Sequence, residues 1–410
     1  MNRKTVLAPS LAVLFILLGT ALLYREAAPL DLNVSNLLLG SGAILGFLLL
    51  GMIYSAVSRV PMTSMISAVC MLLFVHNGYQ FLFGGGSYVI YMILGMACLV
   101  LAFLFVRRWP QVPDLFFYIL SGGIILLMLC NLLFGQALAL DSSSRLWITV
   151  GGMSIQPGEF AKAGLLLQGA LCYRNSKRFR IYLLTGAFTC LSLLMLRDIG
   201  NLAVLVAMFL LMTYLLYDNR LISAVLIGGF LVAFLALLAI FPYALDRFFS
   251  WGKAMTAEGN LQQRQIITSV VVAGVPGLGL ADHAVFTSIY SASSDAALAG
   301  IQAVYGVPAV LVTMLLYSVL VIQAATNRSV YPSNHLILTQ SALVIFCQVL
   351  LNYCGSLDIL PFTGIVAPLI SKGGSAMLTF CLILGACAGS MNPVVTSCVT
   401  RYSSYIPDRK

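Results

Sequence analysis

Charged side chains are scarce in this sequence: Asp, Glu, Lys and Arg together make up 9% of its 410 residues. An average soluble domain carries about a quarter charged residues. So little charge cannot coat the surface of a water-soluble protein of this length, and hydrophobic residues reach 60%. Apolar runs long enough to cross a hydrocarbon core of about 30 Å recur from end to end. The composition therefore excludes a soluble globular protein and predicts an all-α polytopic membrane protein.

The sequence also lacks the marks of a soluble or metal-binding module. No pair of its ten cysteines has CxxC spacing, and no linker or low-complexity tract separates the apolar runs. Most cysteines lie inside those runs, so we interpret them as small buried hydrophobic residues. The net charge of +9 comes from basic residues dispersed among short loops. This pattern follows the positive-inside rule and argues against a nucleic-acid partner.

Hydropathy predicts about twelve transmembrane helices. The expected spans are 5–24, 35–57, 62–83, 87–106, 114–136, 157–173, 181–196, 199–217, 221–243, 302–324, 335–356 and 375–399. The first apolar run is long for a cleaved signal peptide, so we expect it to be retained as a helix.

The distribution of charge predicts that both termini are cytoplasmic. With this orientation, the acids that fall on the inner side are Asp114, Asp218 and Asp408. The basic residues that fall there are Arg3, Lys4, Arg59, Arg107, Arg108, Arg174, Lys177, Arg178, Arg180, Arg220, Arg328, Arg401, Arg409 and Lys410.

Two long segments are expected on the outer side. Residues 244–301, between the ninth and tenth helices, are rich in Gly, Ser and Ala, and 266–273 and 284–290 could form short helices there. A loop of this length in a compact protein is usually functional. Residues 357–374 are rich in Pro and Gly. Such backbone is tolerated at membrane depth only where protein buries it or where it lines a wet cavity.

A charged pair begins the sixth expected helix. Gln156-Pro157-Gly158-Glu159 places a proline near the first turn, where it is tolerated. Glu159 and Lys162 are spaced i,i+3 and so share one helix face. Charges just inside a transmembrane helix need each other, water or a substrate. A structural ion pair and a substrate-binding site both remain open interpretations.

Further polar residues gather on the same expected outer side. Arg197 and Asp198 lie between two spans, with Gly200 nearby, and fit either a solvated turn or a functional site. Gln262 and Gln265 lie in the long loop, and Asp295 comes just before an apolar helix. An acid at that position ordinarily satisfies the free N–H groups of the helix.

Glycines in two places suggest contact with phosphate. Gly274, Gly277 and Gly279 in the long loop are weak evidence, because no Walker lysine follows them. Lys372, Gly373, Gly374 and Ser375 stand immediately before the last helix. Backbone N–H groups of a Gly-Gly turn at a helix N-terminus suit a phosphate, and a neighbouring cation adds attraction.

These motifs, taken in order, resemble those of the SEDS family (shape, elongation, division and sporulation proteins; RodA/FtsW/SpoVE-like). The matches are collinear and cover about residues 140–400. The family's RRWI resembles Arg145–Ile148, its QPSE-x-x-K resembles Gln156–Glu159 with Lys162, and its PDLGT resembles Arg197–Asn201. In the long loop, its YQ-x-x-Q resembles Leu261–Gln265, its GG-x-x-G-x-G resembles Gly274–Gly279, and its TDFIFA resembles Ser294–Asp295 onward. Its N…P-x-TG…P-x-x-S-x-GGSS pattern resembles Asn352, Pro361, Thr363, Gly364, Pro368, Ser371, Gly373, Gly374 and Ser375.

The chain departs from the family pattern at several of these positions. Gly158 replaces the serine of QPSE, and Arg197 and Asn201 replace the proline and threonine of PDLGT. Lys372 stands where the family has tyrosine, and Ala376 where it has a second serine.

The resemblance implies a peptidoglycan glycosyltransferase of the bacterial cytoplasmic membrane that polymerises lipid II, an undecaprenyl-diphosphate-linked disaccharide peptide, on the outer face. It implies a ten-helix core preceded by about two extra helices, and we divide the chain into residues 1–140 and a catalytic part, 141–410. The family's essential aspartate corresponds to Asp295. Its members work with a class B penicillin-binding protein in elongation, division or sporulation.

Elementary chemistry agrees with these roles. A carboxylate such as Asp295 can take the proton of the attacking sugar hydroxyl. The lipid diphosphate leaving group needs cations or helix N-termini, for which Lys162, Arg197, Lys372 and the Gly373-Gly374 turn are candidates. Glu159, Asp198, Gln262, Gln265 and Ser375 complete the expected substrate-binding set. A divalent cation, Mg²⁺ or Mn²⁺, could assist the diphosphate, although no ligand cluster in the sequence demands one.

Two other functions remain open from sequence. A flippase for polyprenyl-diphosphate lipids would line its path with Glu159, Lys162 and Asp198. It would also need charged residues in the cytoplasmic half of the spans, where few occur. A non-catalytic scaffold that activates a transpeptidase would not depend on Asp295.

Overall fold

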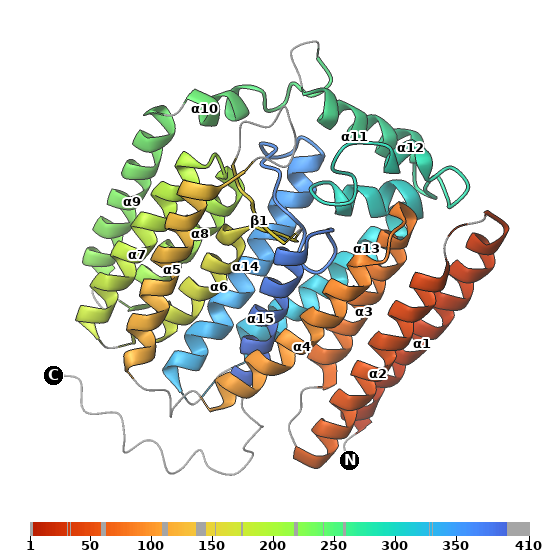
Figure 1. Ribbon diagram of the computed structural model, residues 1–410, viewed down its shortest axis with the longest axis horizontal. Helices are drawn as coiled ribbons and strands as arrows, with labels where there is room; N and C mark the ends of the chain where they lie inside the picture. Colours follow the sequence, from red (N-terminus) through yellow and green to blue (C-terminus); the bar gives the residue numbers. More distant parts are fainter. Residues whose placement is uncertain are drawn as a thin grey trace.

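The computed structural model describes residues 3–391 except 31, 33, 59–62, 109–113, 137–144, 152, 174, 217–219, 241, 257–259, 328 and 330. Within these residues the chain forms a bundle of long, roughly parallel helices (Figure 1). They are α1 (Arg3–Ala27), α2 (Val34–Ser58), α3 (Thr63–Gln80), α4 (Ser87–Arg107), α5 (Leu115–Phe134), α6 (Pro157–Ala170), α7 (Ser176–Met195), α8 (Ile199–Leu216), α9 (Arg220–Ile240), α13 (Ala297–Thr326), α14 (Pro332–Ser356) and α15 (Gly374–Ser390).

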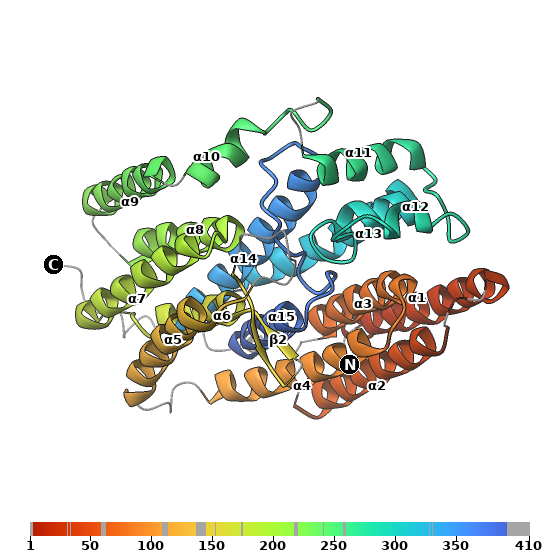
Figure 2. The ribbon, with the colours of Figure 1, turned by 45° about the horizontal axis from the view of Figure 1, so that its top comes forward.

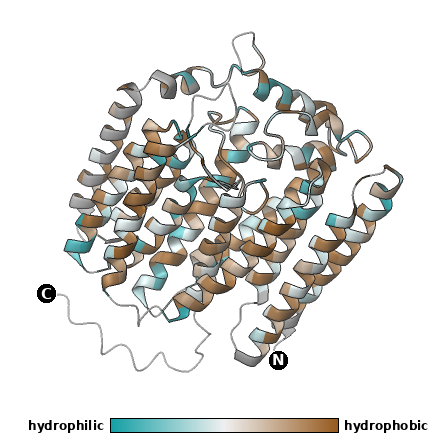
Figure 3. Ribbon diagram, in the orientation of Figure 1, coloured by the Kyte–Doolittle hydropathy of each residue, from teal (hydrophilic) through white to brown (hydrophobic). Residues whose placement is uncertain are grey.

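Each expected span corresponds to one of these helices, and the all-α polytopic membrane fold is confirmed. In the described part of the chain, eight helices are long and apolar enough to cross a membrane, and α8 and α15 contain shorter apolar helices. The last span was expected to reach residue 399, but α15 ends at Ser390 and residues 392–399 lie outside the described ones. Hydrophobic residues dominate the helices along most of their length (Figure 3).

One end of the bundle carries most of the non-helical chain, and we call it the loop end (Figure 1). It holds the short helices α10 (Pro242–Phe249), α11 (Leu261–Ala273) and α12 (Ala284–Thr287), and the 3-10 turns η1 (Ala28–Leu30) and η2 (Phe81–Phe83). It also holds a hairpin of β1 (Ile148–Val150) and β2 (Met153–Ile155), in which Ile148 pairs with Ile155. The expected helix at 266–273 is the second part of α11, whereas that at 284–290 ends at Thr287.

Gly277 of the long loop and Gly306 of α13 allow a close approach of two backbones. Helix α13 is broken at Gly306, whose φ of 82° is unfavourable for residues with a side chain. Residues 275–279 enter this break, and the amide of Leu278 donates to the carbonyl of Ala303 at 2.8 Å. A side chain on Gly277 would begin 2.4 Å from the amide nitrogen of Gly306. Gly277 is therefore needed for chain packing, whereas Gly274 and Gly279 have positive φ angles of 61° and 75° that favour glycine.

Helices from opposite ends of the chain pack side by side (Figure 2). Helix α3 lies between the α1–α2 pair and α13, and α4 lies along α15. Small residues allow the contact between α4 and α15, as is common between membrane helices. A Cβ added to Gly385 of α15 would lie 2.2 Å from the carbonyl oxygen of Leu99. A Cβ added to Gly389 would lie 2.7 Å from the carbonyl oxygen of Phe103. The division expected at residue 140 falls within 137–144, outside the described residues, and stays a prediction.

We expect Gly385→Ala to lower the melting temperature of the purified protein in detergent, because the backbone of α4 cannot yield to the new methyl group. Overpacking of this kind costs about 1–3 kcal/mol. Gly122→Ala in α5 is the matched control, since nothing lies within 4 Å of its added Cβ. It should leave the melting temperature unchanged or raise it slightly. Equal effects of the two substitutions would contradict the close packing of α4 on α15.

Candidate functional site

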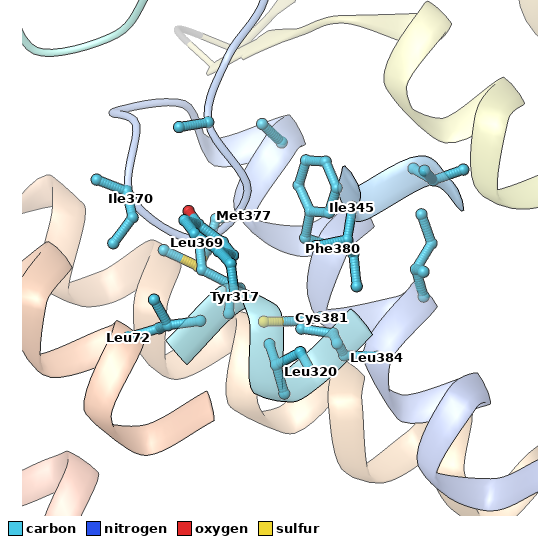
Figure 4. Packing of buried hydrophobic residues seen from close by; sticks show 14 of the residues in the cluster. Leu72, Tyr317, Leu320, Ile345, Leu369, Ile370, Met377, Phe380, Cys381 and Leu384 are labelled. Carbon is cyan, nitrogen blue, oxygen red and sulfur yellow. The ribbon is translucent and has the colours of Figure 1, made fainter. Parts of the chain in front are cut away.

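The non-helical segment between α14 and α15, residues 357–373, forms the centre of the loop end. Residues 361–367 have no regular secondary structure, and Gly364 has a φ of 67°. Leu369 and Ile370 are buried, and Figure 4 shows them beside Tyr317 of α13 and near Leu72 of α3. The segment therefore enters the bundle instead of crossing its surface, as the expectation for Pro- and Gly-rich backbone at membrane depth requires.

Glu159 and Lys162 form the expected ion pair on the first turns of α6. The carboxylate oxygen lies 3.0 Å from the ammonium nitrogen, and the two side chains are 1% and 0% exposed. The ammonium donates hydrogen bonds to Asn201 Oδ1 at 2.8 Å and Gln348 Oε1 at 3.0 Å. It also lies 5.3 Å from the centre of the Phe380 ring. The buried charge is thus compensated within the protein.

Asp198 joins this ion pair to the start of α8. Its carboxylate accepts from the backbone amide of Asn201 at 3.0 Å, as an N-terminal helix cap does, and from the Asn201 side chain at 2.9 Å. Gln156 also donates to it, at 3.2 Å. Burial raises the pKa of Asp198 above its usual value, and the Asn201 hydrogen bonds oppose that rise. We call Gln156, Glu159, Lys162, Asp198, Asn201 and Gln348 the ionic cluster.

Asn201 shows what one departure from the family pattern does. Its amide oxygen accepts from Lys162 while its NH₂ group donates to Asp198, so a single side chain connects a cation and an acid. A threonine has one hydroxyl in place of these two separate groups. Asparagine therefore suits this position in the present chain.

Asp295 lies one residue before the N-cap of α13 and is half-buried at the loop end. One carboxylate oxygen is 3.3 Å from the place that a Cβ on Gly364 would occupy. Its own carbonyl accepts from Asn352 Nδ2 at 2.7 Å and from the Ser356 hydroxyl at 3.3 Å. Both donors belong to α14, so this helix fixes the backbone that carries the carboxylate.

Segment 357–373 and the first residues of α15 link Asp295 to the ionic cluster. Asn352 donates to Ile365 as well as to Asp295, at 2.7 Å in each case. A Cβ on Gly200 would lie 3.0 Å from Ile365, and the amide of Gln156 donates to the Ser375 hydroxyl at 2.9 Å. The structure thus brings Glu159, Lys162, Asp198 and Ser375 to one side of this segment and Asp295 to another.

The remaining expected residues lie around this centre. Gln262 donates to the carbonyl of Tyr290 at 3.1 Å and to the Ser291 hydroxyl, so it supports the loop that leads to Asp295. Gln265 is exposed and lines a separate pocket of about 280 Å³ on the long loop. Arg197 and Lys372 have exposed side chains at the loop end.

The Gly373-Gly374 turn has a packing role in addition to any role with phosphate. Gly373 is the N-cap residue of α15, and a Cβ on Gly374 would lie 2.5 Å from the ring of Tyr91 in α4. In the described part of the chain, no three His, Cys, Asp or Glu residues are grouped so that they could hold a metal ion.

Sequence reasoning missed several residues that hold this centre together. They are Gln348 and Ser356 of α14, and His76, Tyr79 and Gln80 of α3. The available signal was a polar side chain in the middle or last turn of an otherwise apolar helix, because such a group needs a partner.

Comparison with known proteins shows similarity to one family of cell cycle proteins and to several named peptidoglycan glycosyltransferases. A family model described as cell cycle protein FTSW_RODA_SPOVE matches residues 47–389. A probable peptidoglycan glycosyltransferase FtsW of Bacillus subtilis is 26% identical over 268 residues, which are 60% of this chain and 65% of that relative. The peptidoglycan glycosyltransferase RodA of Mycobacterium tuberculosis is 24% identical over 75% of this chain and 71% of its own length.

Two solved structures share the fold. One is a chain from a study of polymerization and crosslinking by a peptidoglycan synthase complex, with a TM-score of 0.60 at 20% identity over 79% of this chain and 95% of that chain. The other is the rod shape determining protein RodA of Thermus thermophilus, with a TM-score of 0.54 at 19% identity over 78% and 93%.

We expect Lys162→Met to destabilise the protein strongly, because it leaves the buried Glu159 carboxylate without its cation. Breaking one partner of a buried pair costs about 3–5 kcal/mol. The double variant Glu159→Gln/Lys162→Met removes both charges and should recover most of this loss in a thermal melt. Lys177→Met, which removes an exposed lysine of α7, is the control. A double variant as unstable as Lys162→Met would contradict the proposed energetics of the pair.

Proposed function

The chain belongs to the FtsW/RodA/SpoVE cell cycle protein family, and from this premise we propose that it is a peptidoglycan glycosyltransferase that polymerises lipid II. Its curated relatives are named for peptidoglycan glycosyltransferase activity. The observation that carries the proposal for this chain is the position of Asp295. It is a half-buried carboxylate at the loop end, set against a glycine and fixed through its backbone by α14.

In the proposed reaction a sugar hydroxyl of one lipid-linked glycan attacks the anomeric carbon of another. The new carbon–oxygen bond forms as the bond from that carbon to the diphosphate breaks. Asp295 takes the hydroxyl proton as general base. The diphosphate leaves as an anion and needs no proton, so one carboxylate suffices, unlike the pair of a glycoside hydrolase.

The departing diphosphate would meet positive charge and hydrogen-bond donors at the loop end. Lys372 and Arg197 have exposed side chains there, and the N-terminus of α15 begins directly after Gly373. Preorganised cations and helix N-termini stabilise developing negative charge. Among the described residues, the buried Thr363 hydroxyl next to Gly364 has no hydrogen-bond partner, and it is a further candidate to bind substrate.

Lys162 is proposed to act at a distance from the diphosphate. Its side chain is 0% exposed, and its ammonium already contacts Glu159, Asn201 and Gln348. The ionic cluster would then hold α6, α8 and α14 together beneath the site. This arrangement does not favour the flippase alternative, because the charges are compensated within the protein and do not line an open path.

The orientation and partners follow from the same proposal. The loop end would face the outside of the bacterial cytoplasmic membrane, with both termini in the cytoplasm, and lipid II would reach Asp295 from the bilayer. A class B penicillin-binding protein would cross-link the product. One structural relative was solved in a peptidoglycan synthase complex, which supports such a partner. Among the described residues no three His, Cys, Asp or Glu are grouped as a metal site, so a Mg²⁺ or Mn²⁺ ion would depend on ligands from the diphosphate.

We expect Asp295→Asn to lower the rate of lipid II polymerisation about 10²- to 10⁴-fold, because the amide cannot accept the hydroxyl proton. The measurement is polymer formation by purified protein, with and without a cognate class B penicillin-binding protein. Asp282→Asn is the matched control, since Asp282 is exposed in the same long loop. An Asp295→Asn variant that polymerises at the wild-type rate would refute the role of Asp295. Wild-type protein that never polymerises, yet still activates the transpeptidase, would favour the scaffold alternative.

A further inference from the structure

Helix α3 carries a group of buried polar side chains at its loop end. His76, Asn77, Tyr79 and Gln80 are at most 2% exposed, although the helix around them is apolar. Burying polar groups is costly unless they form hydrogen bonds. The hydrogen-bond partners of these side chains therefore show which segments of the chain the end of α3 holds in place.

Three of the four residues bind backbone of the long loop or of segment 357–373. The Tyr79 hydroxyl donates to the carbonyl of Ala292 at 2.7 Å. Gln80 Nε2 donates to the carbonyls of Ser293 at 2.9 Å and Ile370 at 3.0 Å. The ring Nδ1 of His76 lies 2.9 Å from the same carbonyl of Ile370. The end of α3 thus contacts both the loop before Asp295 and the segment before α15.

The carbonyls of residues 292–295 are all held from outside their own loop. Ala292 is bound by Tyr79, and Ser293 is bound by Gln80 and by the backbone amide of Lys372 at 2.7 Å. Ser294 is bound by the Ser371 hydroxyl, and Asp295 by Asn352 and Ser356. With each successive carbonyl bound, these donors fix the backbone from which the Asp295 side chain extends.

We propose that Gln80 and Tyr79 are positioning residues for Asp295. This inference rests on the proposed function, in which Asp295 is the general base. Gln80 joins the Asp295 loop to segment 357–373 through one NH₂ group, and Tyr79 fixes the residue three positions before Asp295. Neither side chain contacts the reacting atoms. Their loss would misplace the carboxylate relative to the sugar hydroxyl while leaving the surfaces that bind lipid intact.

Asn77 provides a matched control on the same helix. It is 0% exposed, but it faces α2, where its NH₂ group donates to the carbonyl of Leu37 at 2.8 Å and to the Ser41 hydroxyl at 3.2 Å. Asn77→Leu and Gln80→Leu therefore each remove a buried amide that makes two hydrogen bonds. Only Gln80 binds the Asp295 loop.

The experiment compares Gln80→Leu, Tyr79→Phe and Asn77→Leu in the full-length protein. We expect Gln80→Leu to lower kcat about 10- to 100-fold with KM unchanged, because misplacement of a catalytic group by about 1 Å costs this much. Tyr79→Phe should give a smaller decrease in kcat, and Asn77→Leu should retain wild-type kcat. In the Asp295→Asn background, Gln80→Leu should have no further effect on the residual rate.

Hydrogen exchange of peptides covering residues 290–300 gives a second readout that needs no activity. Exchange should become faster in Gln80→Leu and Tyr79→Phe, and remain at the wild-type rate in Asn77→Leu. The proposal is overturned if Gln80→Leu and Tyr79→Phe match Asn77→Leu in both kcat and exchange. If wild-type protein does not polymerise lipid II, the proposed function fails, and the exchange data still decide whether α3 anchors the loop.

Discussion

A backbone carbonyl that is buried away from water needs a hydrogen-bond donor from the protein itself, and this constraint shapes the whole loop end. Residues 361–367 of segment 357–373 have no regular secondary structure, so side chains from other elements must bind polar groups of this backbone. Tyr317 donates to the carbonyl of Pro368, Asn352 to that of Ile365, and Gln80 to that of Ile370. This requirement explains why Gln80, Tyr317 and Asn352 occur in otherwise apolar helices.

The same donors prepare the site for chemistry. Asn352 and Gln80 each bind one carbonyl of segment 357–373 and one carbonyl of the loop that leads to Asp295. Satisfying the irregular backbone therefore also fixes the backbone that carries the Asp295 carboxylate. A group that is positioned before substrate arrives needs little reorganisation during the reaction. In this protein, the stability of the segment and the geometry of the proposed base depend on the same hydrogen bonds.

Local sequence patterns predicted much of the fold, because hydropathy and helical spacing act over neighbouring residues. The expected spans matched helices, and the i,i+3 spacing correctly paired Glu159 with Lys162. The partners of Lys162 on α8 and α14 were not predictable, since they depend on how separate helices pack. The glycines at 274–279 illustrate the limit: their spacing suggested phosphate, whereas the structure shows them beside the break in α13. The site roles of Asp295 and the exposed cations stay predictions.

The two helices before α3 acquire a physical role from this arrangement. Helix α2 approaches α3 closely enough that a Cβ on Gly40 would lie 2.3 Å from Asn77, and Asn77 binds the carbonyl of Leu37. Helix α3 is thus held on one side by α2 while its other polar residues hold the Asp295 loop. A helix moves largely as a rigid unit. Contacts that hold α3 against α2 therefore also restrict the movement of the Tyr79 and Gln80 side chains. The family match begins at residue 47, within α2, so Leu37 and Gly40, which contact Asn77, lie outside the matched region. The N-terminal helices would then stabilise the proposed site through α3, without contributing a residue to it.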